Sequence, residues 1–503
     1  MRLLRSSAPL AALSTAACLT PHVDEERPDL QALMRGEVRE EWVMETADGA
    51  YDRTPFWMTF EDPVLDALVV EALEHNHDLV ASAERLRAAA ARSLVSRSAR
   101  RPQIDARFDA ARQKQVFVGF PGGVFGNTFN QYAVGADVSW ELDLWGKLKA
   151  GVDAADADVQ AFYADYQGAR LSIAAQVTTA WFVLRETTEQ VRLAEETLAT
   201  YDRSLGVVQD RYDAGLSGAL DLRLSEANVA GSRAQLAVTE QARAAAARQI
   251  EILLGRYPAA ELEIAGNFEG LPPAVPAGVP AAILGRRPDL VAIERGVAAA
   301  EALARQARLD RLPSIALTAS GGSISTELED LLDGDFSVWS LAGRLVVPLI
   351  DGGRRRAQIA ESLAALREAR SAYASAALRA FFEVENSLDA ERRLMERLGH
   401  LEEAAVRSRE ATELADDQYR EGLVSIEIVL DSQRRQLQAE SAFLVARREL
   451  YQNRVDLHVA LGGNFDADPE LADDAVDALE TDDPATGDEI DDADPVDEIE
   501  DEQ

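Results

Sequence analysis

The sequence predicts a mixed α/β membrane protein in which each chain adds four strands to a shared β-barrel and carries long antiparallel helical hairpins. Three observations predict this fold class: one unit occurs twice, each copy carries two strands with one apolar and one polar face, and each copy carries a very long proline-free helix. Only 6% of the residues are aromatic, which favours thin helix-on-helix packing over one thick core.

Composition excludes several function classes. The 503 residues carry 88 acidic and 51 basic side chains, a net charge of −37, so nucleic acid is not an expected partner because phosphate binding needs clustered cations. The single cysteine excludes a disulfide framework and a cysteine-based zinc site. The five histidines are scattered, and no phosphate-binding loop or Ser-His-Asp pattern occurs. We therefore expect no enzyme, no cofactor and no metal site.

The N-terminus has the pattern of an export signal. A basic start and a short apolar run, residues 1–17, precede Cys18, and Thr15-Ala16-Ala17 before it resembles a bacterial lipoprotein box although Thr15 stands where leucine is usual. Acylation of Cys18 would anchor the chain to a membrane. Residues 18–74 would form the lipidated segment and the start of an equatorial region, meaning the part around the middle of the long helices. No other run of about 18 apolar residues occurs, so we expect no transmembrane helix.

An internal duplication organises the chain. An offset of 207 residues pairs Tyr212 with Tyr419 and Gly215 with Gly422, which defines copies at 75–255 and 286–462. The proline-rich residues 256–285 between them predict a linker. Residues 463–503 predict a disordered tail, because positions 466–503 hold 19 acidic and no basic residues.

Each copy predicts a helix, two strands, a long helix, a turn and a returning helix. The first copy should begin with a helix over 65–100, followed by a hairpin at 103–143 with strands 103–116 and 132–142 around a glycine-rich loop at 119–130. The second hairpin should span 313–348, with strands 314–321 and 336–348. Alternation along these strands predicts one lipid-like face that contains Val134, Val138, Trp140, Leu142, Leu341, Leu345 and Val347.

The helices after each hairpin are unusually long. Residues 147–210 and 354–417 lack proline over 64 positions each, about 95 Å of helix, and begin after the turns at Gly146 and at Gly352-Gly353. Gly215 and Gly422 should end them, and helices 220–254 and 427–461 should return antiparallel.

Four strands cannot close into a barrel, because transmembrane barrels need at least eight. Unpaired edges in lipid would leave backbone groups without hydrogen bonds, so the strands must be pooled between chains, and three chains would supply twelve. On periodicity alone, a soluble hairpin packed against its own helices remains the alternative.

Several motifs carry a family resemblance over residues 55–465. Trp145-Gly-Lys147, Pro348-Leu-Ile-Asp-Gly-Gly-Arg354, the two Tyr-x-x-Gly-Leu turns, Asn76-His-Asp-Leu79 and Arg286-Arg-Pro-Asp289 together resemble the outer membrane efflux protein family, in its lipidated subgroup that serves resistance-nodulation-division pumps. The resemblance implies a homotrimer with a twelve-stranded barrel in the outer membrane of a Gram-negative bacterium and a helical tunnel through the periplasm. It also implies an adaptor protein and an inner-membrane pump as partners, and passive conduction of drugs or other small molecules.

The same resemblance implies a gate at the hairpin turns, with candidate residues Asp221, Asp431, Tyr212 and Tyr419. Threefold symmetry would turn each aspartate into a ring of negative charge that attracts cations. This sequence departs from some relatives because Val424 stands near the position of a gate arginine, and Arg211 or Arg420 could replace it as the partner. A solvent-facing role stays open for both aspartates.

Two other interpretations remain at this point. The channel could serve type I protein secretion or metal-ion export, although the histidines and methionines do not cluster. Alternatively, the chain could be a structural coiled-coil lipoprotein without a pore. The two amphipathic hairpins argue against a purely helical stalk, and the exported substrate is not encoded in a recognisable motif.

Overall fold

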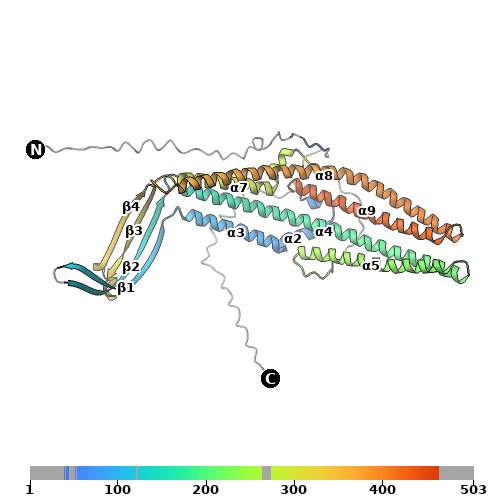
Figure 1. Cartoon of the computed structure of the whole chain (residues 1–503), viewed down its shortest axis with the longest axis horizontal. Coiled ribbons are helices and arrows are strands. Elements are labelled where there is room, and N and C mark those ends of the chain that lie inside the picture. The colour runs from blue at the N-terminus through green and yellow to red at the C-terminus, as the bar shows by residue number, and fades with distance from the viewer. Residues whose placement is uncertain are drawn as a thin grey trace, which may run out of the picture.

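The computed structural model of the chain is elongated, with a β-sheet at one end and two helical hairpins that reach the other end (Figure 1). The structure describes residues 39, 41–44, 51, 54–120, 123–262 and 274–463. The predicted signal 1–17, Cys18, the middle of the linker and the acidic tail from residue 464 lie outside the described residues. No helix in the described ranges combines the length and the apolar character needed to cross a membrane.

The sheet has four antiparallel strands in the order β1-β2-β3-β4. They are β1 Gln103–Phe120, β2 Gly123–Leu142, β3 Ser314–Ser325 and β4 Ser337–Val346. The glycine-rich residues 119–130, predicted as a loop, are mostly strand, because backbone pairing continues out to Phe120 and Gly123. Valine and phenylalanine between the glycines favour the extended backbone, and this preference outweighs the turn tendency of glycine.

The helix predicted over 65–100 is two helices, α2 Pro63–His75 and α3 His77–Ser98. Asn76 breaks it because its backbone is extended, with ψ of 123°. Its side-chain oxygen accepts hydrogen bonds from the backbone N–H groups of Asp78 and Leu79 at 3.0 and 3.1 Å, as an N-cap does. Its amide donates to the Leu253 carbonyl at 2.9 Å, so the break is tied to the end of α5.

The second copy has the same break. Helix α6 Ile283–Arg286 is followed by α7 Pro288–Leu309, and Arg287 between them is extended, with ψ of 117°. Proline at the first position of α7 suits a helix start, because this position has no hydrogen-bond partner for an N–H group. Short helical turns precede α2 at η2 Phe56–Phe60 and α6 at η3 Pro280–Ala282, and two more, η4 Glu329–Leu332 and η5 Gly334–Phe336, connect β3 to β4.

The long helices are α4 Lys147–Asp213 and α8 Arg354–Arg420, each of 67 residues and about 100 Å long. They run three residues past the predicted ends, because the left-handed residues Gly215 and Gly422, with φ of 74° and 77°, come only after the last turn. Helices α5 Ala219–Leu253 and α9 Ile426–Ala460 return along them.

The helices form one layer. Near the sheet the packing order is α3, α4, α7, α8, and beyond the breaks it is α5, α4, α9, α8. The main core lies at the middle, where η2 and α2 pack on α4, α5 and α9 around Trp181 and Phe182. Helices α3 and α5 therefore form one edge of the layer, and α8 forms the other.

Candidate functional site: an amphipathic sheet and a helical tip

One face of the sheet is apolar across all four strands. The pairing places Ile104 opposite Val138, Val138 opposite Ala319, and Ala319 opposite Leu341, so these side chains share one face. The same face carries Ala106, Phe108, Ala110, Val134, Ala136, Trp140, Leu142, Ile315, Leu317, Trp339 and Leu345. Most of the large ones, such as Phe108, Trp339 and Leu341, are exposed to solvent in the single chain. An apolar face of this kind needs a nonaqueous partner.

The opposite face is mainly polar, although Ile324, Val338 and Val346 also lie on it. Arg107 makes an ion pair with Asp137 at 2.9 Å, and the hydroxyl groups of Ser320 and Ser340 lie 2.8 Å apart. The pairing also places Asp105, Asp109, Gln131, Ser139, Glu141, Thr318 and Arg344 on this face. Apolar and polar residues thus alternate as in a transmembrane barrel, with lipid on one side and water on the other.

The height of the apolar face fits a bilayer. It extends along β2 from Leu142 to Tyr132, and beyond that level the same face carries Arg112 and Lys114. Ten residue steps tilted by about 40° span roughly 26 Å, close to the apolar band of transmembrane barrels. Among the described residues, β1 pairs only with β2 and β4 only with β3, so this part of the chain leaves two open sheet edges.

Three glycines connect the sheet to the long helices. Gly146, Gly352 and Gly353 have φ of 77°, 65° and 90°, a left-handed backbone that glycine adopts without strain. Nearby carboxylates cap both helices: Asp143 accepts from two backbone N–H groups of α4, and Asp351 accepts from those of Gly353, just before α8, and of Arg355 in its first turn.

The two hairpin turns meet at the far end in a small apolar cluster. Val208, Leu222, Ile426 and Val429 are buried there, together with Tyr419. The Arg211 guanidinium lies 4.9 Å from the centre of the Tyr419 ring and donates to the Tyr419 carbonyl at 3.1 Å. Of the two predicted partners for Tyr419, Arg211 therefore makes the contact.

Arg420, the other candidate, pairs with Asp416 and Asp417 on its own helix at 2.6 and 3.3 Å. In the single chain the Tyr419 side chain is buried rather than directed into an opening, whereas Tyr212 is exposed. The stacked pair of Arg211 and Tyr419 instead joins the α4–α5 hairpin to the α8–α9 hairpin.

The two predicted gate aspartates have different surroundings. Asp221 lies in the first turn of α5, where its carboxylate is 3.4 Å from the backbone nitrogen of Gly218. Asp431 accepts hydrogen bonds from Arg435 at 2.7 Å and from Arg434. Donation by Arg435 and Arg434 lowers the pKa of Asp431, so this carboxylate stays ionised. The sequence analysis missed both arginines, although spacings of three and four residues on a helix signal such pairs.

Residues 68–256 and 279–463 match the model of a family described as outer membrane efflux protein. The chain belongs to this family. The matched ranges follow the two copies of the duplicated unit and include the sheet, both long helices and both tips. The predicted family, and the function and location that it carries, an efflux component of the outer membrane, are therefore confirmed.

Curated relatives agree with this assignment. The chain is 30% identical over 425 residues to the pyoverdine export outer membrane protein OpmQ of Pseudomonas aeruginosa, a match that covers 83% of this chain and 89% of the relative. It is 31% identical to outer membrane protein OprJ of the same species over 92% of this chain and 96% of the relative. It is also 31% identical to the toluene efflux pump protein TtgF of Pseudomonas putida, with coverage of 81% and 85%.

Solved structures of efflux channels share the fold. The outer-membrane channel OprN superposes with a TM-score of 0.78 at 29% identity and covers 88% of this chain and 99% of its own. The open state of the MtrE channel of Neisseria gonorrhoeae gives 0.77 at 27% identity, with coverage of 88% and 98%. The predicted combination of barrel strands and long helical hairpins in each chain of this outer membrane efflux protein is confirmed.

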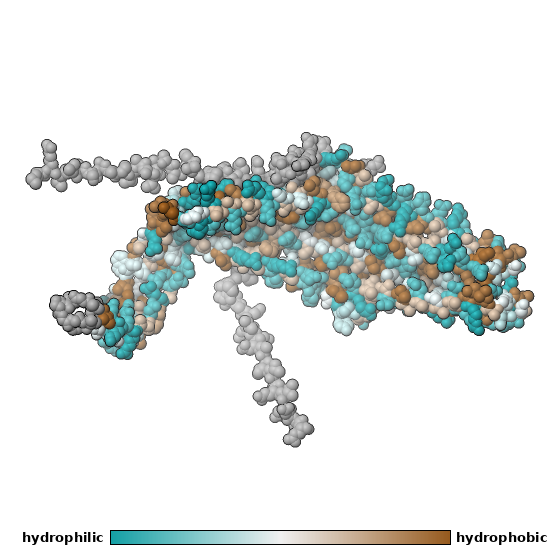
Figure 2. Space-filling model, in the orientation of Figure 1, coloured by the Kyte–Doolittle hydropathy of each residue, from teal (hydrophilic) through white to brown (hydrophobic). Residues whose placement is uncertain are grey.

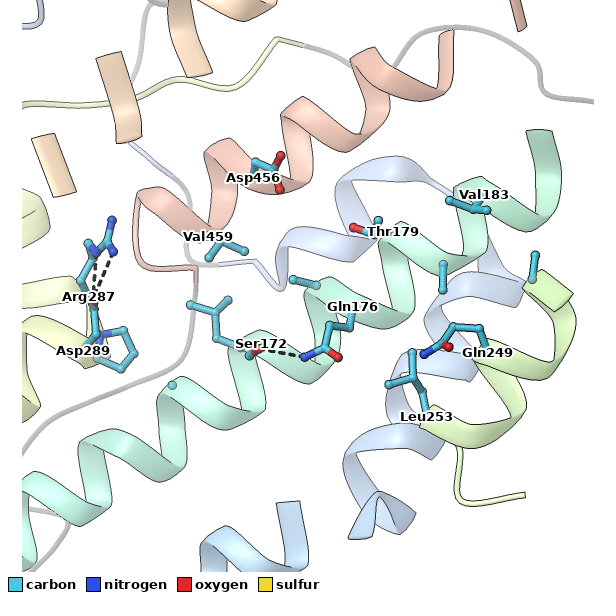
Figure 3. Close-up of a pocket in the computed structure, with 16 residues that line it drawn as sticks. Ser172, Gln176, Thr179, Val183, Gln249, Leu253, Arg287, Asp289, Asp456 and Val459 are labelled. Atoms are coloured by element: carbon cyan, nitrogen blue, oxygen red, sulfur yellow. Dashed lines mark hydrogen bonds and ion pairs between the residues drawn. The ribbon is translucent and has the colours of Figure 1, made fainter. Parts of the chain in front are cut away.

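A groove of about 610 Å³ lies midway along α4, between α5 and the start of α7 (Figure 3). Its wall is mainly apolar, and several of its polar groups are satisfied within the chain. Gln176 donates to Ser172 at 3.0 Å, and Arg287 is held by Asp289 and Glu383. The described residues bring together no group of three or more His, Cys, Asp or Glu that could hold a metal ion.

Sequence reasoning missed two buried polar groups at equivalent positions of the two copies. Glu251 accepts backbone N–H groups from Ala260 and Glu261, both at 2.7 Å, and so fixes the start of the linker. The residue 207 positions later is His458, whose Nδ1 lies 2.9 Å from the Tyr51 hydroxyl group. Glu251 thus holds the chain that directly follows α5, whereas His458 holds a segment from the distant N-terminal part of the chain. Only the duplication offset could have signalled this correspondence.

His458 predicts a specific loss of stability in acid. Burial, together with the nearby charge of Arg454, lowers its pKa from 6.5 to about 4. An unfolded chain binds a proton at this histidine below pH 6.5, whereas the folded chain does so only near pH 4. Stability should therefore fall as the pH drops through that window, by about 3 kcal/mol from this group. Circular dichroism melting of wild-type protein and His458→Gln between pH 7.5 and 4 checks this.

The variant should lose less stability over that range than the wild-type protein, whatever its stability at pH 7.5. His400→Gln is the matched control, because His400 is exposed on α8. A pH dependence that is the same in wild-type protein and His458→Gln would contradict the prediction.

Proposed function

We propose that three copies of this chain close their sheets into one twelve-stranded barrel and their helices into one tunnel, which passively conducts small molecules out of the cell. The observation that carries the proposal is a sheet of bilayer height with one apolar face, one polar face and two open edges. Open edges are not tolerated in lipid. Because all four strands alternate in direction, β4 of one copy can pair antiparallel with β1 of the next.

The helical layer supports the same assembly. Among the described elements it also has two edges without a further helix, α3 with α5 on one side and α8 on the other. Exposed apolar side chains occur along these edges, among them Val95, Val238, Leu378 and Phe382. Contacts between neighbouring copies would cover them and continue the barrel as a tunnel of about 100 Å across the periplasm.

Within this proposal, a periplasmic adaptor and an inner-membrane pump complete the efflux system. Relatives are named for pyoverdine export and for toluene efflux, which are chemically different cargoes. The polar sheet face offers small hydroxyl groups and paired charges rather than a dedicated binding site. We therefore propose that the pump selects the substrate and that the channel only transmits it.

Purified protein in detergent, studied by mass measurement and by single-channel recording in planar bilayers, tests the proposal. We expect a particle with the mass of three chains and discrete conductance steps. A soluble monomer that produces no conductance would contradict the proposal.

We further propose that Asp431 belongs to the gate at the tip. Asp431→Ala should raise single-channel conductance or weaken block by divalent cations, because each copy loses a negative charge at the constriction. The structure adds a second consequence: Arg434 and Arg435 lose their shared partner, so selectivity should move towards anions. Reversal potentials in a salt gradient measure this shift.

Asp389 supplies a matched control, because it pairs with Arg392 and Arg393 at the same spacings, on α8 and far from the tip. Asp389→Ala removes the same kind of charge cluster and should leave conductance and selectivity unchanged. Equal behaviour of both variants and the wild-type channel would remove Asp431 from the gate.

A further inference from the structure

Seven exposed cations gather where the chain crosses between sheet and helices. None of the seven makes an ion pair within the described ranges of the chain. The crossings are α3 to β1, β2 to α4, α7 to β3, and β4 to α8. We name these cations the basic collar: Arg100, Arg101, Lys149, Arg308, Arg311, Arg354 and Arg356. The collar contrasts with a chain whose net charge is −37.

The four crossings are tied side by side. The Trp140 indole donates to the Arg100 carbonyl at 2.9 Å, and the Trp145 indole donates to the Pro313 carbonyl at 2.6 Å. Arg355 pairs with Asp310 at 3.0 Å, which connects the fourth crossing to the third. The collar residues therefore lie at one level along the molecule, where the sheet meets the helices.

Acidic side chains at this level are already engaged. Glu141 pairs with Lys147 at 2.6 Å, and Asp143 caps the start of α4. Asp351 pairs with Arg355 at 3.1 Å and caps α8. In the described part of the chain, Glu141, Asp143, Asp310 and Asp351 at the crossings thus already have partners other than the collar, so its positive charge is available to an external anion.

Apolar side chains accompany the cations. Leu349 and Ile350, just after β4, are 88% and 96% exposed, and Leu144 and Leu312 are exposed at two other crossings. Val347 and Leu349 continue the alternation of Leu345 on the apolar face. Figure 2 shows a hydrophobic patch at the corner where the sheet meets the helices, beside hydrophilic residues over the start of α8. Apolar residues that border exposed arginines are typical of a surface at the membrane–water boundary.

We propose that the basic collar binds the phosphate headgroups of anionic phospholipids in the leaflet that faces the periplasm. This inference rests on the proposed function, because the apolar face must first lie in the bilayer. The collar then sits at headgroup level, where each cation near an anionic surface strengthens binding by about five-fold. Guanidinium groups suit this ligand, because their fork of donors matches phosphate oxygens.

Closure of the barrel concentrates the charge at the seams between copies. When β4 of one copy pairs with β1 of a second copy, the β4–α8 crossing of the first lies beside the α3–β1 crossing of the second. Arg354 and Arg356 of one copy then lie close to Arg100 and Arg101 of the other. Four unpaired guanidinium groups would then repel one another at each seam. An anionic headgroup between them relieves this repulsion, so the seams are the expected binding sites.

Quenching of tryptophan fluorescence by brominated lipids tests the proposal. Trp140, Trp145 and Trp339 lie on the sheet or at its crossings, three of the six tryptophans in the chain. The full-length protein is reconstituted in phosphatidylcholine bilayers that contain brominated phosphatidylglycerol or brominated phosphatidylcholine. We expect a relative binding constant at least three-fold in favour of phosphatidylglycerol, which declines as salt is added.

The test variant combines R100Q, R101Q, R354Q and R356Q, and should reduce the preference to below 1.5-fold. Its control combines R85Q, R243Q, R248Q and R367Q, four exposed arginines on helices away from the collar, and should keep the preference. Lysine at the four seam positions should restore at least half of the preference, measured as the logarithm of the relative binding constant.

Two results would overturn the inference. Equal quenching by both lipids in the wild-type protein, with normal channel conductance in the same bilayers, would contradict the collar but leave the proposed function intact. Quenching by neither lipid would contradict insertion of the sheet itself, and the proposed function would fail with it.

Discussion

Replacement of Leu341 by arginine is expected to prevent assembly of the channel in the outer membrane. Leu341 lies opposite Ala319, Ala319 opposite Val138, and Val138 opposite Ile104, at the middle of the apolar face. A cation at the middle of a bilayer destabilises a transmembrane strand by about 2–4 kcal/mol, and a trimer would repeat this three times. The fraction of protein recovered from outer membranes as a detergent-resistant oligomer measures the effect.

The neighbouring residue provides the control. Ser340 lies one position along β4, and its side chain therefore points to the polar face, where its hydroxyl meets that of Ser320. Ser340→Arg adds the same charge to the same strand but should assemble normally, because the new guanidinium meets water and carboxylates such as Asp137. If both variants assembled equally well, or failed equally, the two faces of the sheet would be wrongly assigned.

This contrast explains why the sheet could be predicted from the sequence. Alternation with a period of two is a local property, so Val134, Val138 and Trp140 reveal a shared face without knowledge of any contact. The extent of each strand could not be read in the same way. Residues 119–130 contain turn-forming glycines, and only pairing with the opposite strand keeps them extended.

Breaks in the helices show a similar limit. Asn76 stands inside an apolar pattern that continues on both sides of it, and an asparagine is tolerated within many helices. Its role as a cap depends on the Leu253 carbonyl, 177 residues away, which accepts its amide N–H. A pattern in one segment carries no information about such a distant partner.

The tip shows what resemblance and spacing each contribute. The repeated motif singles out the glycines at 215 and 422, and both have a positive φ in the structure. The surroundings of Tyr419 were not predictable from spacing, because Arg211 reaches it from the other hairpin. The partners of Asp431 were predictable, since Arg434 and Arg435 lie three and four positions along the same helix.

Replacement of Glu391 by alanine is expected to destabilise the fold more than the loss of a carboxylate from a solvent-exposed ion pair. Arg454, buried at 3% exposure, donates to Glu391 from Nε at 2.9 Å and from Nη2 at 2.7 Å, and Asn453 donates to the same carboxylate. In Glu391→Ala the guanidinium stays buried without this counter-charge, which destabilises a fold by about 3–5 kcal/mol. Thermal melting in detergent, followed by circular dichroism, measures the lower midpoint.

Two further variants show whether burial, rather than the ion pair as such, causes the loss. Glu449 pairs with Arg397 at 2.6 Å, also between α9 and α8, but this pair is exposed to solvent. Glu449→Ala should therefore change stability by less than about 1 kcal/mol. The double variant Glu391→Leu with Arg454→Met replaces both charges by apolar groups and should recover most of the stability that Glu391→Ala loses. If Glu391→Ala and Glu449→Ala melted at the same temperature, the buried guanidinium would not be the cause. The charge of Arg454 also lowers the pKa of His458. The double variant should therefore raise the pKa of this histidine and reduce the loss of stability in acid that His458 causes.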